Sequence, residues 1–281
     1  MRSRSLLAVA MLAVAGGGSA AYAVSDVYAI DLRANPNRLL RFPVNAPANT
    51  ALSTNASFDG FAMDFSADAS TLYGITNPGN AFGTIDQTTG NFTSIATISG
   101  DGAAETNWSG LASAPDGTFY ASAAGGAGVN RLYTLNPVTG ATTLVGAIGA
   151  GTAAINIDIS IDRTGQMYGH DIGTDRFFQI DKTNGNVTFL GSGTSGFNAN
   201  FAQGMDFDWD TNTLYATLYI GAGSGHFVSV NTTTGAATSI TPTLSWNAEM
   251  EMAVKAAIPE PVSLSALAVT GLALGRRGRR N

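Results

Sequence analysis

The sequence contains no cysteine and only two histidines, His170 and His226, among 281 residues. Disulfides, thiol nucleophiles and thiolate metal sites are therefore excluded, and a hydrolytic triad or a histidine-rich metal site is disfavoured. Neither a G-x-S-x-G elbow nor a phosphate-binding P-loop is present. The glycine-rich stretch 191–196 matches G-x-G-x-x-G, but FNANF follows it in place of a helix, so it predicts no dinucleotide site.

Charge is also scarce, since only 12% of the residues are charged and the net charge is −6. Six of the 14 basic residues lie in the two ends of the chain, which leaves eight between residues 24 and 258. The same region holds 19 of the 20 acidic residues, so its net charge is −11. A domain this acidic repels phosphate backbones, and nucleic acid is not an expected partner. Cations, neutral glycans and basic proteins remain open.

The first 23 residues have the three parts of an export signal. MRSR is basic, LLAVAMLAVA is apolar, and the small residues Ala21 and Ala23 precede Val24. The apolar run is shorter than the roughly 20 residues that a membrane-spanning helix needs. We therefore expect residues 1–23 to be a signal peptide that is cleaved after Ala23.

The other end combines a helix-breaking motif, an apolar run and a basic terminus. Pro259, Glu260 and Pro261 precede 14 residues, 262–275, that carry no charge. Together with residues 256–258 the run approaches the length that spans a bilayer, and it is predicted to be a transmembrane segment whose basic end stays in the cytoplasm. The rigid Pro-Glu-Pro site would then lie outside the membrane, accessible to a membrane protease. The basic residues of this end are Arg276, Arg277, Arg279 and Arg280.

This three-part tail, residues 258–281, resembles the PEP-CTERM sorting signal. The resemblance implies recognition by an exosortase-type protease and cleavage near residues 259–261. It also implies release or attachment at the surface of a Gram-negative-type cell, and a link to extracellular polysaccharide. The alternative is an ordinary C-terminal anchor in which Pro-Glu-Pro occurs by chance.

The region between the two ends contains a repeat of 47 or 48 residues. Four segments align, and each is predicted to form four short strands with apolar alternation and turn residues between them. In the turn between the third and fourth strands, an Asp or Asn comes first and a Gly follows four residues later. We interpret these as turn residues and not as a catalytic array. The repeated positions are Tyr73, Tyr120, Tyr168 and Tyr215; Asp86, Asn136, Asp181 and Asn231; and Gly90, Gly140, Gly185 and Gly235.

A four-stranded unit of this length, repeated around a ring, predicts an all-β fold: a β-propeller. The opening VYAIDLRANPNRLLRFPVNAPANTALS supplies three strands of a further blade, in which Tyr28 lies 45 residues before Tyr73. The closing EMEMAVK supplies its missing inner strand. We therefore expect residues 24–257 to form five four-stranded blades, closed by pairing of the N- and C-terminal strands. These repeats also resemble uncharacterised secreted propellers, which implies a fold and little more.

Four aromatic residues precede the innermost strands by three to five positions. If they gathered at the mouth of the channel, they could stack on the faces of sugars. Packing between blades is the alternative. The four candidates are Phe58, Trp108, Phe201 and Trp246.

Three carboxylates, Asp64, Asp206 and Glu251, are predicted to share one position of the innermost strand. Ala112 and Ser160 stand there in the other two blades. Acids around a channel could bind Ca²⁺ or act as the acid and base of glycoside cleavage. A purely structural role is the alternative, and we assign no catalytic residue, metal ligand or cofactor.

These features predict an exported protein of the cell surface or extracellular matrix. We expect a non-enzymatic binding module for polysaccharide or protein, held by the membrane only through its C-terminal segment before processing. The alternative is a polysaccharide-cleaving enzyme that uses the channel carboxylates.

Overall fold

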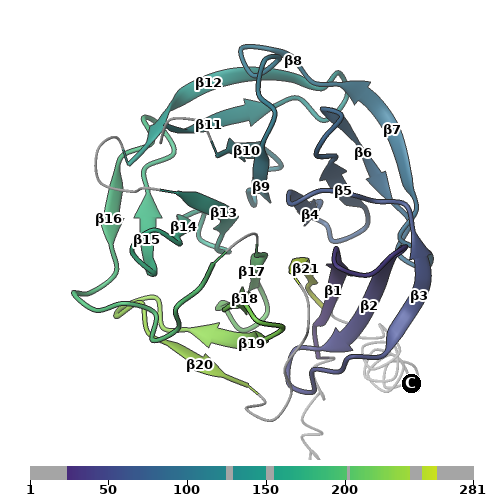
Figure 1. The fold of residues 1–281 in the computed structure, drawn as a ribbon. Helices are drawn as coiled ribbons and strands as arrows, with labels where there is room; N and C mark the ends of the chain where they lie inside the picture. Colours follow the sequence, from purple (N-terminus) through teal and green to yellow (C-terminus); the bar gives the residue numbers. More distant parts are fainter. Residues whose placement is uncertain (1–23, 125–128, 150–154, 201–202, 241–248, 258–281) are drawn as a thin grey trace, which may run out of the picture.

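The computed structural model describes residues 24–124, 129–149, 155–200, 203–240 and 249–257. Every regular element in these ranges is a β-strand. The strands form five sheets, which stand around a common axis as the blades of a β-propeller (Figure 1). The four main strands of each blade are antiparallel, and only the short β8 (Ser99–Gly100) pairs parallel, with β12 (Ala141–Ile148). The predicted all-β, five-bladed fold is thus confirmed.

We number the blades in chain order and give each from its inner to its outer strand. Blade 1 contains β21 (Met250–Lys255), β1 (Asp26–Asp31), β2 (Asn37–Pro43) and β3 (Ala51–Ala56). Blade 2 contains β4 (Met63–Phe65), β5 (Leu72–Ile75), β6 (Ala81–Ile85) and β7 (Phe92–Thr97). Blade 3 contains β9 (Trp108–Ser113), β10 (Phe119–Ala123), β11 (Asn130–Leu135) and β12 (Ala141–Ile148), with the short β8 (Ser99–Gly100) at its outer edge. Blade 4 contains β13 (Asn156–Ile161), β14 (Met167–Asp171), β15 (Arg176–Ile180) and β16 (Val187–Phe189). Blade 5 contains β17 (Met205–Asp208), β18 (Thr213–Tyr219), β19 (Gly225–Val230) and β20 (Ala237–Ser239).

The ring is closed by the two ends of the described chain. Strand β21 pairs antiparallel with β1 along its whole length, from Asp26 opposite Lys255 to Asp31 opposite Met250. This pairing completes blade 1, because the last strand of the domain supplies the innermost strand of the first blade and β1 gains a partner on each side. The predicted closure is confirmed.

The repeated turns are built as their residues predict. In blade 2, Asp86 Oδ1 accepts hydrogen bonds from the backbone N–H groups of Thr88 and Thr89 at 2.9 and 2.7 Å. Gly90 then adopts a φ of +74°, which favours glycine. The equivalent turns of blades 3, 4 and 5 start at Asn136, Asp181 and Asn231 and end at Gly140, Gly185 and Gly235.

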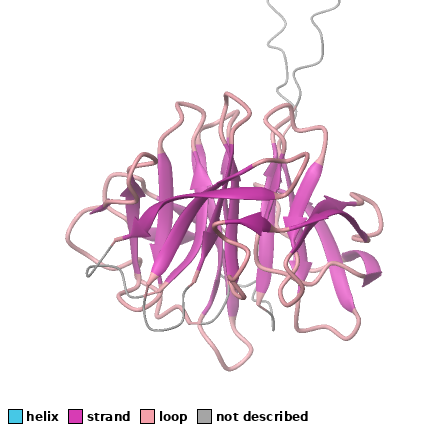
Figure 2. Ribbon diagram, turned by 90° about the horizontal axis from the view of Figure 1, so that it is seen from above, coloured by secondary structure: helices cyan, strands magenta, loops and turns pink. Residues whose placement is uncertain are grey.

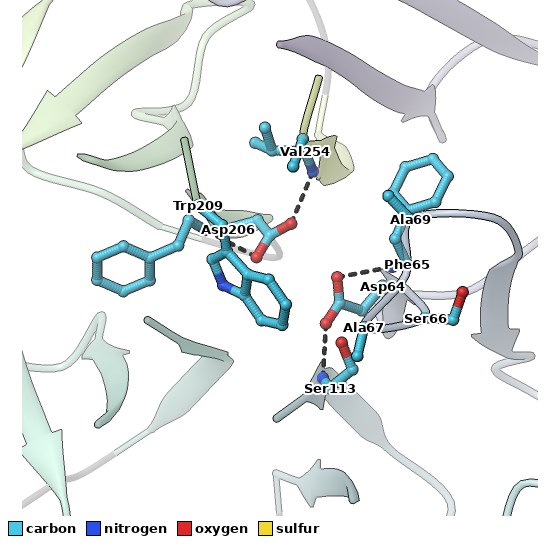
Figure 3. A pocket seen from close by; sticks show the side chains of 11 residues that line it. Asp64, Phe65, Ser66, Ala67, Ala69, Ser113, Asp206, Trp209 and Val254 are labelled. Carbon is cyan, nitrogen blue, oxygen red and sulfur yellow. Dashed lines mark hydrogen bonds between the residues drawn. The ribbon is translucent and has the colours of Figure 1, made fainter. Parts of the chain in front are cut away.

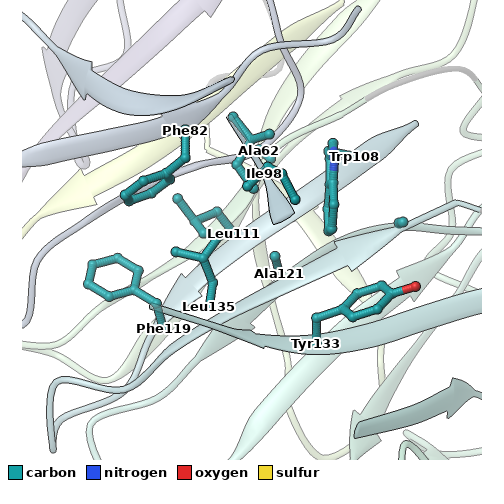
Figure 4. Packing of buried hydrophobic residues seen from close by; sticks show 11 residues of the cluster. Ala62, Phe82, Ile98, Trp108, Leu111, Phe119, Ala121, Tyr133 and Leu135 are labelled. Atoms are coloured by element: carbon teal, nitrogen blue, oxygen red, sulfur yellow. The ribbon is translucent and has the colours of Figure 1, made fainter. Parts of the chain in front are cut away.

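The hydrophobic core is divided into five clusters, and each cluster lies between two neighbouring blades. The cluster between blades 2 and 3, for example, joins Phe82 of β6 to Trp108 and Leu111 of β9 (Figure 4). The blades are therefore held together mainly by apolar burial, which favours a closed ring in which each blade has two neighbours.

The propeller has two faces that carry different connections (Figure 2). The tight turns between the first and second strands, and between the third and fourth strands, lie on one face. Because β21 ends and β1 begins at this side, both ends of the described chain lie there too. We call it the turn face. The loop face, opposite, carries the connections between second and third strands, such as residues 32–36.

The predicted leader and sorting tail, residues 1–23 and 258–281, lie outside the described residues. Within the described part, no helix is long and apolar enough to cross a membrane.

Candidate functional site

The inner strands place two layers of side chains around the channel. The strand register puts Asp64 opposite Tyr73 and Asp206 opposite Tyr215, so these two acids do occupy one equivalent position. In blade 1, however, Tyr28 stands opposite Ala253. The prediction that Glu251 shares the position of the two aspartates was therefore wrong by two residues.

Glu251 instead belongs to a second layer, together with an acid that the sequence analysis missed. Asp158 lies two residues before Ser160, and Ser160 stands opposite Tyr168. Glu251 lies two residues before Ala253 in the same way. The signal was present in the sequence, because residues two apart on a strand point to the same side. The channel thus contains four buried carboxyl groups in two layers: Asp64 and Asp206, and Asp158 and Glu251.

The carboxyl groups of the first layer bond to the backbone of the next blade. Asp64 Oδ2 accepts the N–H of Ser113 in blade 3 at 2.6 Å. Asp206 Oδ2 accepts the N–H of Val254 in blade 1 at 2.6 Å. The second oxygen of Asp206 accepts the hydroxyl of Ser160 in blade 4 at 2.8 Å. Figure 3 shows the two carboxyl groups approaching from opposite sides, with the bonds from Ser113 to Asp64 and from Val254 to Asp206.

The second layer repeats this arrangement at two other blade junctions. Asp158 Oδ2 accepts the N–H of Met205 in blade 5 at 2.6 Å. Glu251 Oε1 accepts the N–H of Met63 in blade 2 at 2.9 Å, whereas its Oε2 is buried without a partner. Four of the five junctions are therefore bridged by a carboxyl group that satisfies a buried backbone donor, an arrangement that orders and stabilises the ring.

The fifth junction, between blades 3 and 4, is formed by close packing of β9 against β13. Gly110 of β9 lies so near to β13 that a Cβ atom on it would lie 2.5 Å from Asp158 Oδ1. Nearby, the hydroxyl of Ser109 donates to the carbonyl oxygen of Asn156 at 3.3 Å. A glycine is needed here because only a residue without a side chain allows the two backbones to approach this closely.

Burial makes all four carboxyl groups hard to ionise. It raises the pKa of Asp206 to about 6. Burial and then the charge of Asp206 raise the pKa of Asp64 well above its usual value. Burial and then Glu251 do the same for the pKa of Asp158, and burial together with Asp206 raises the pKa of Glu251. The cause in each case is loss of hydration, which disfavours the charged form.

The space beside the first layer is small. It opens towards the turn face, where Trp209 forms one wall and donates its indole N–H to the carbonyl oxygen of Ile161 at 2.8 Å. Its volume is about 20 Å³, which holds about one water molecule. A sugar ring does not fit between Asp64 and Asp206. Among the described residues, no group of three or more Asp, Glu or His side chains could hold a metal ion.

The predicted aromatic mouth is wrong for the two members that the structure describes. Phe58 and Trp108 are both fully buried, and the Trp108 indole N–H donates to Asn80 Oδ1 at 3.1 Å. Trp108 packs edge-on against Tyr133 (Figure 4), and Phe58 packs against Phe92. Their rings fill the gaps between blades, so neither can stack on a sugar. The other two members, Phe201 and Trp246, lie outside the described residues.

Replacement of Trp108 by alanine is expected to destabilise the domain by about 3–5 kcal/mol, because it removes a large buried side chain between two blades. Urea unfolding followed by circular dichroism measures this change. Val138→Ala is the control, since Val138 is 78% exposed and its loss should change the free energy of unfolding by less than about 0.5 kcal/mol. A Trp108→Ala protein of unchanged stability would contradict the packing role.

His170 is also part of the interior. Its ring stacks on Phe177 with centroids 4.2 Å apart, and the side chain is 1% exposed. Burial lowers its pKa to about 4, so the ring is neutral at physiological pH. It therefore offers no exposed acid or base on the loop face.

The two ends of the domain meet at a second polar cluster, on the turn face. Asp208 is the last residue of β17, and Asp210 lies in the turn between β17 and β18. The hydroxyl of Ser25 donates to Asp208 Oδ1 at 2.6 Å and to Asp210 Oδ2 at 3.1 Å. The backbone N–H of Ala257 donates to the same oxygen of Asp210 at 2.7 Å. We call Ser25, Asp208, Asp210 and Ala257 the terminal clasp.

Comparisons with known proteins identify the fold alone. No protein-family model and no curated protein matches the chain. Among solved structures, TolB from Acinetobacter baumannii is 14% identical, with a TM-score of 0.50, and the match covers 84% of this chain and 67% of that one. A chain in a nidogen–laminin complex is 11% identical, with a TM-score of 0.51, and the match covers 84% of this chain and 99% of that one. The fold thus defines the class of protein as a five-bladed β-propeller.

Proposed function

We propose that this protein is an exported, non-enzymatic binding module that is displayed at the cell surface through its sorting tail. The observation that carries the proposal is the state of the channel carboxyl groups. All four bridge neighbouring blades, and the space beside Asp64 and Asp206 has a volume of about 20 Å³, which leaves no room for a substrate between these two. The outer surface of an acidic propeller then remains as the functional part, and its partner is a protein or a polysaccharide.

The neighbouring folds support this assignment by analogy. One of the similar chains belongs to a complex of two proteins, nidogen and laminin, so the fold can serve as a partner-binding scaffold. The alternative, a polysaccharide-cleaving enzyme, requires two carboxyl groups that face a common cleft about 5–10 Å apart. Asp64, Asp206 and Glu251 are instead buried and bonded to backbone N–H groups of adjacent blades.

The positions of the chain ends suggest how the module is presented. Ser25 and Ala257 both lie on the turn face, and the tail that carries Pro259, Glu260 and Pro261 starts next to it. A chain anchored by this tail would hold its turn face towards the membrane and its loop face outwards. An exosortase-type protease would cut the tail only a few residues from the domain, within about 15 Å.

Partner binding can be tested on extracellular matrix from the producing cells. The purified processed protein is expected to bind this matrix, and the binding is measured after treatment of the matrix with protease or with periodate. Loss after protease indicates a protein partner, and loss after periodate indicates a polysaccharide. Absence of binding to the untreated matrix, or release of reducing sugar by the wild type that Asp206→Asn abolishes, would overturn the proposal.

Because the chain contains no cysteine, single introduced cysteines can test which face of the domain points away from the cell. Arg33→Cys places a thiol on the loop face and Val138→Cys places one on the turn face, at positions that are exposed in the isolated domain. On intact cells, a bulky maleimide is expected to label Cys at position 33 several times faster than at position 138, while both react alike in the purified protein. Equal rates on cells would contradict the proposed orientation.

A further inference from the structure

The terminal clasp contains two acids and no described cationic partner. Asp208 and Asp210 accept hydrogen bonds from hydroxyl and backbone N–H groups. Within the described part of the chain, the salt bridges involve other acids, namely Asp26, Asp31, Glu105 and Glu249. Two negative charges thus stand together at the point where the chain enters and leaves the domain, and their mutual repulsion would be relieved by a cation.

A cavity lies beside these acids, and Val24 forms part of its wall. The cavity has a volume of about 370 Å³ and is lined by Val24, Ser25, Asp208 and Asp210, together with Val44, Asn45, Thr211 and Tyr215. Val24 is 47% exposed, whereas Ser25 is 2% exposed and bonded to both acids. Val24 directly precedes Ser25, so its backbone nitrogen lies only one residue, or about 3.8 Å of chain, from a residue of the terminal clasp.

Removal of the leader changes the charge of that nitrogen. In the unprocessed chain it is a neutral amide, whereas cleavage after Ala23 turns it into an α-ammonium group with an ordinary pKa of about 8. We infer that this new ammonium group is the missing cation of the terminal clasp, and that it pairs with Asp208 and Asp210. Maturation would then strengthen the closure of the ring, because the clasp ties blade 5 to both ends of blade 1. The inference rests on the export step of the proposed function.

The pairing predicts a pH dependence of definite sign. Two nearby carboxylates favour the charged form of the ammonium group, so its pKa rises above the unfolded value of about 8. Its contribution to stability is fully present below pH 8 and is lost as the pH rises through the folded pKa. The titratable groups that line the cavity with Val24 are Asp208, Asp210 and Tyr215. Of the charged residues on the neighbouring strands of blade 1, Asp26 pairs with Arg41, and Lys255 bonds to Gln87.

The test moves the ammonium group without touching the domain. A Gly-Ser insertion between Ala23 and Val24 in the full-length gene displaces the new N-terminus by about 7 Å of chain. The exported protein is purified, and mass spectrometry establishes where it begins. At pH 6.5 the insertion is expected to lower the unfolding temperature by about 2–4 °C, whereas at pH 10 the two proteins should unfold alike.

Asp210→Asn supplies the matched background, since asparagine still accepts the N–H of Ala257 but carries no charge. In this variant the insertion should lower the unfolding temperature by less than half as much. The pH dependence of N-terminal acylation gives a second readout, and the half-point is expected above pH 8. An insertion effect that is equal at both pH values, or equal in the Asp210→Asn background, overturns the inference. If the purified wild-type protein does not start at Val24, the export step of the proposed function is refuted instead.

Discussion

A chain that stops after Glu249 is expected not to fold, whereas a chain that stops after Ala257 is expected to fold completely. The first chain lacks β21, whose residues from Met250 to Val254 are at most 5% exposed. Burial of each Met or Val side chain contributes about 1.5–3 kcal/mol, so the loss of Met250, Met252 and Val254 alone approaches the whole stability of an ordinary domain. The edge of β1 would also be left unpaired.

The two truncations differ only by the closing strand and its two following residues, which makes each the control of the other. Circular dichroism during heating should show a cooperative transition for the chain that ends at Ala257 and none for the chain that ends at Glu249. Limited proteolysis should cut the shorter chain throughout the blades. If both chains unfold at the same temperature, the ring does not depend on the closing strand, and the architecture inferred from that pairing is wrong.

Much of the fold could be predicted from the sequence because its signals are local. Each turn such as 86–90 carries its own acceptor and its own glycine, and each strand carries its own alternation. The repeated tyrosines then fix the phase of one blade against the next. The sequence has three strands of a blade at the N-terminus and a single strand at the C-terminus. Together they make one four-stranded blade, and closure of the ring could be predicted from this.

The side chains of the channel were harder to place because alternation repeats every two residues. A shift of the closing strand by two residues keeps every residue on the same side, so the pattern of EMEMAVK fits Glu251 in either layer. Only the pairing of Tyr28 with Ala253 decides between them. Asp158 was missed for a related reason, since the repeat was aligned at one position of each innermost strand, which in blade 4 is Ser160, and Asp158 lies two residues before it on the same side.

The aromatic residues were misplaced because a position along a strand does not say which gap a side chain fills. Phe58 does lie before the innermost strand β4, as the repeat predicts, whereas Trp108 is the first residue of the innermost strand β9. Their rings, however, turn away from the axis into the gaps between blades, where apolar area is buried on both sides. Large rings find more contacts there than at a wet channel mouth, and dispersion together with the hydrophobic effect decides the outcome.

Glu251→Gln is expected to raise the unfolding temperature at pH 7.5 by several degrees. Gln keeps the oxygen that accepts the N–H of Met63 and removes a charge that burial and Asp206 disfavour. One unit of pKa elevation corresponds to about 1.4 kcal/mol, or roughly 3–5 °C for a domain of this size. In the unfolded chain, Glu251 ionises near pH 4.3. Because its pKa is higher in the folded protein, the wild type becomes less stable as the pH rises from about 4.3 through the folded pKa.

The pH profile separates this electrostatic effect from simple repacking. Between pH 5 and 7.5 the exposed turn acids Asp68 and Asp86, whose pKa values are lowered, stay ionised in both states and add no slope. His170, whose pKa is lowered to about 4 by burial, adds a slope of opposite sign below about pH 6.5, because the unfolded state binds its proton there, but it does so equally in both proteins. Relative to the wild type, Glu251→Gln should therefore gain more stability at pH 7.5 than at pH 5. Glu251→Ala is the contrasting variant, because it leaves the N–H of Met63 buried without an acceptor and should destabilise by about 1–3 kcal/mol at both pH values. If Gln and Ala at position 251 lower the unfolding temperature equally, the carboxyl group does not bridge the blades as an acceptor whose charge is unfavourable.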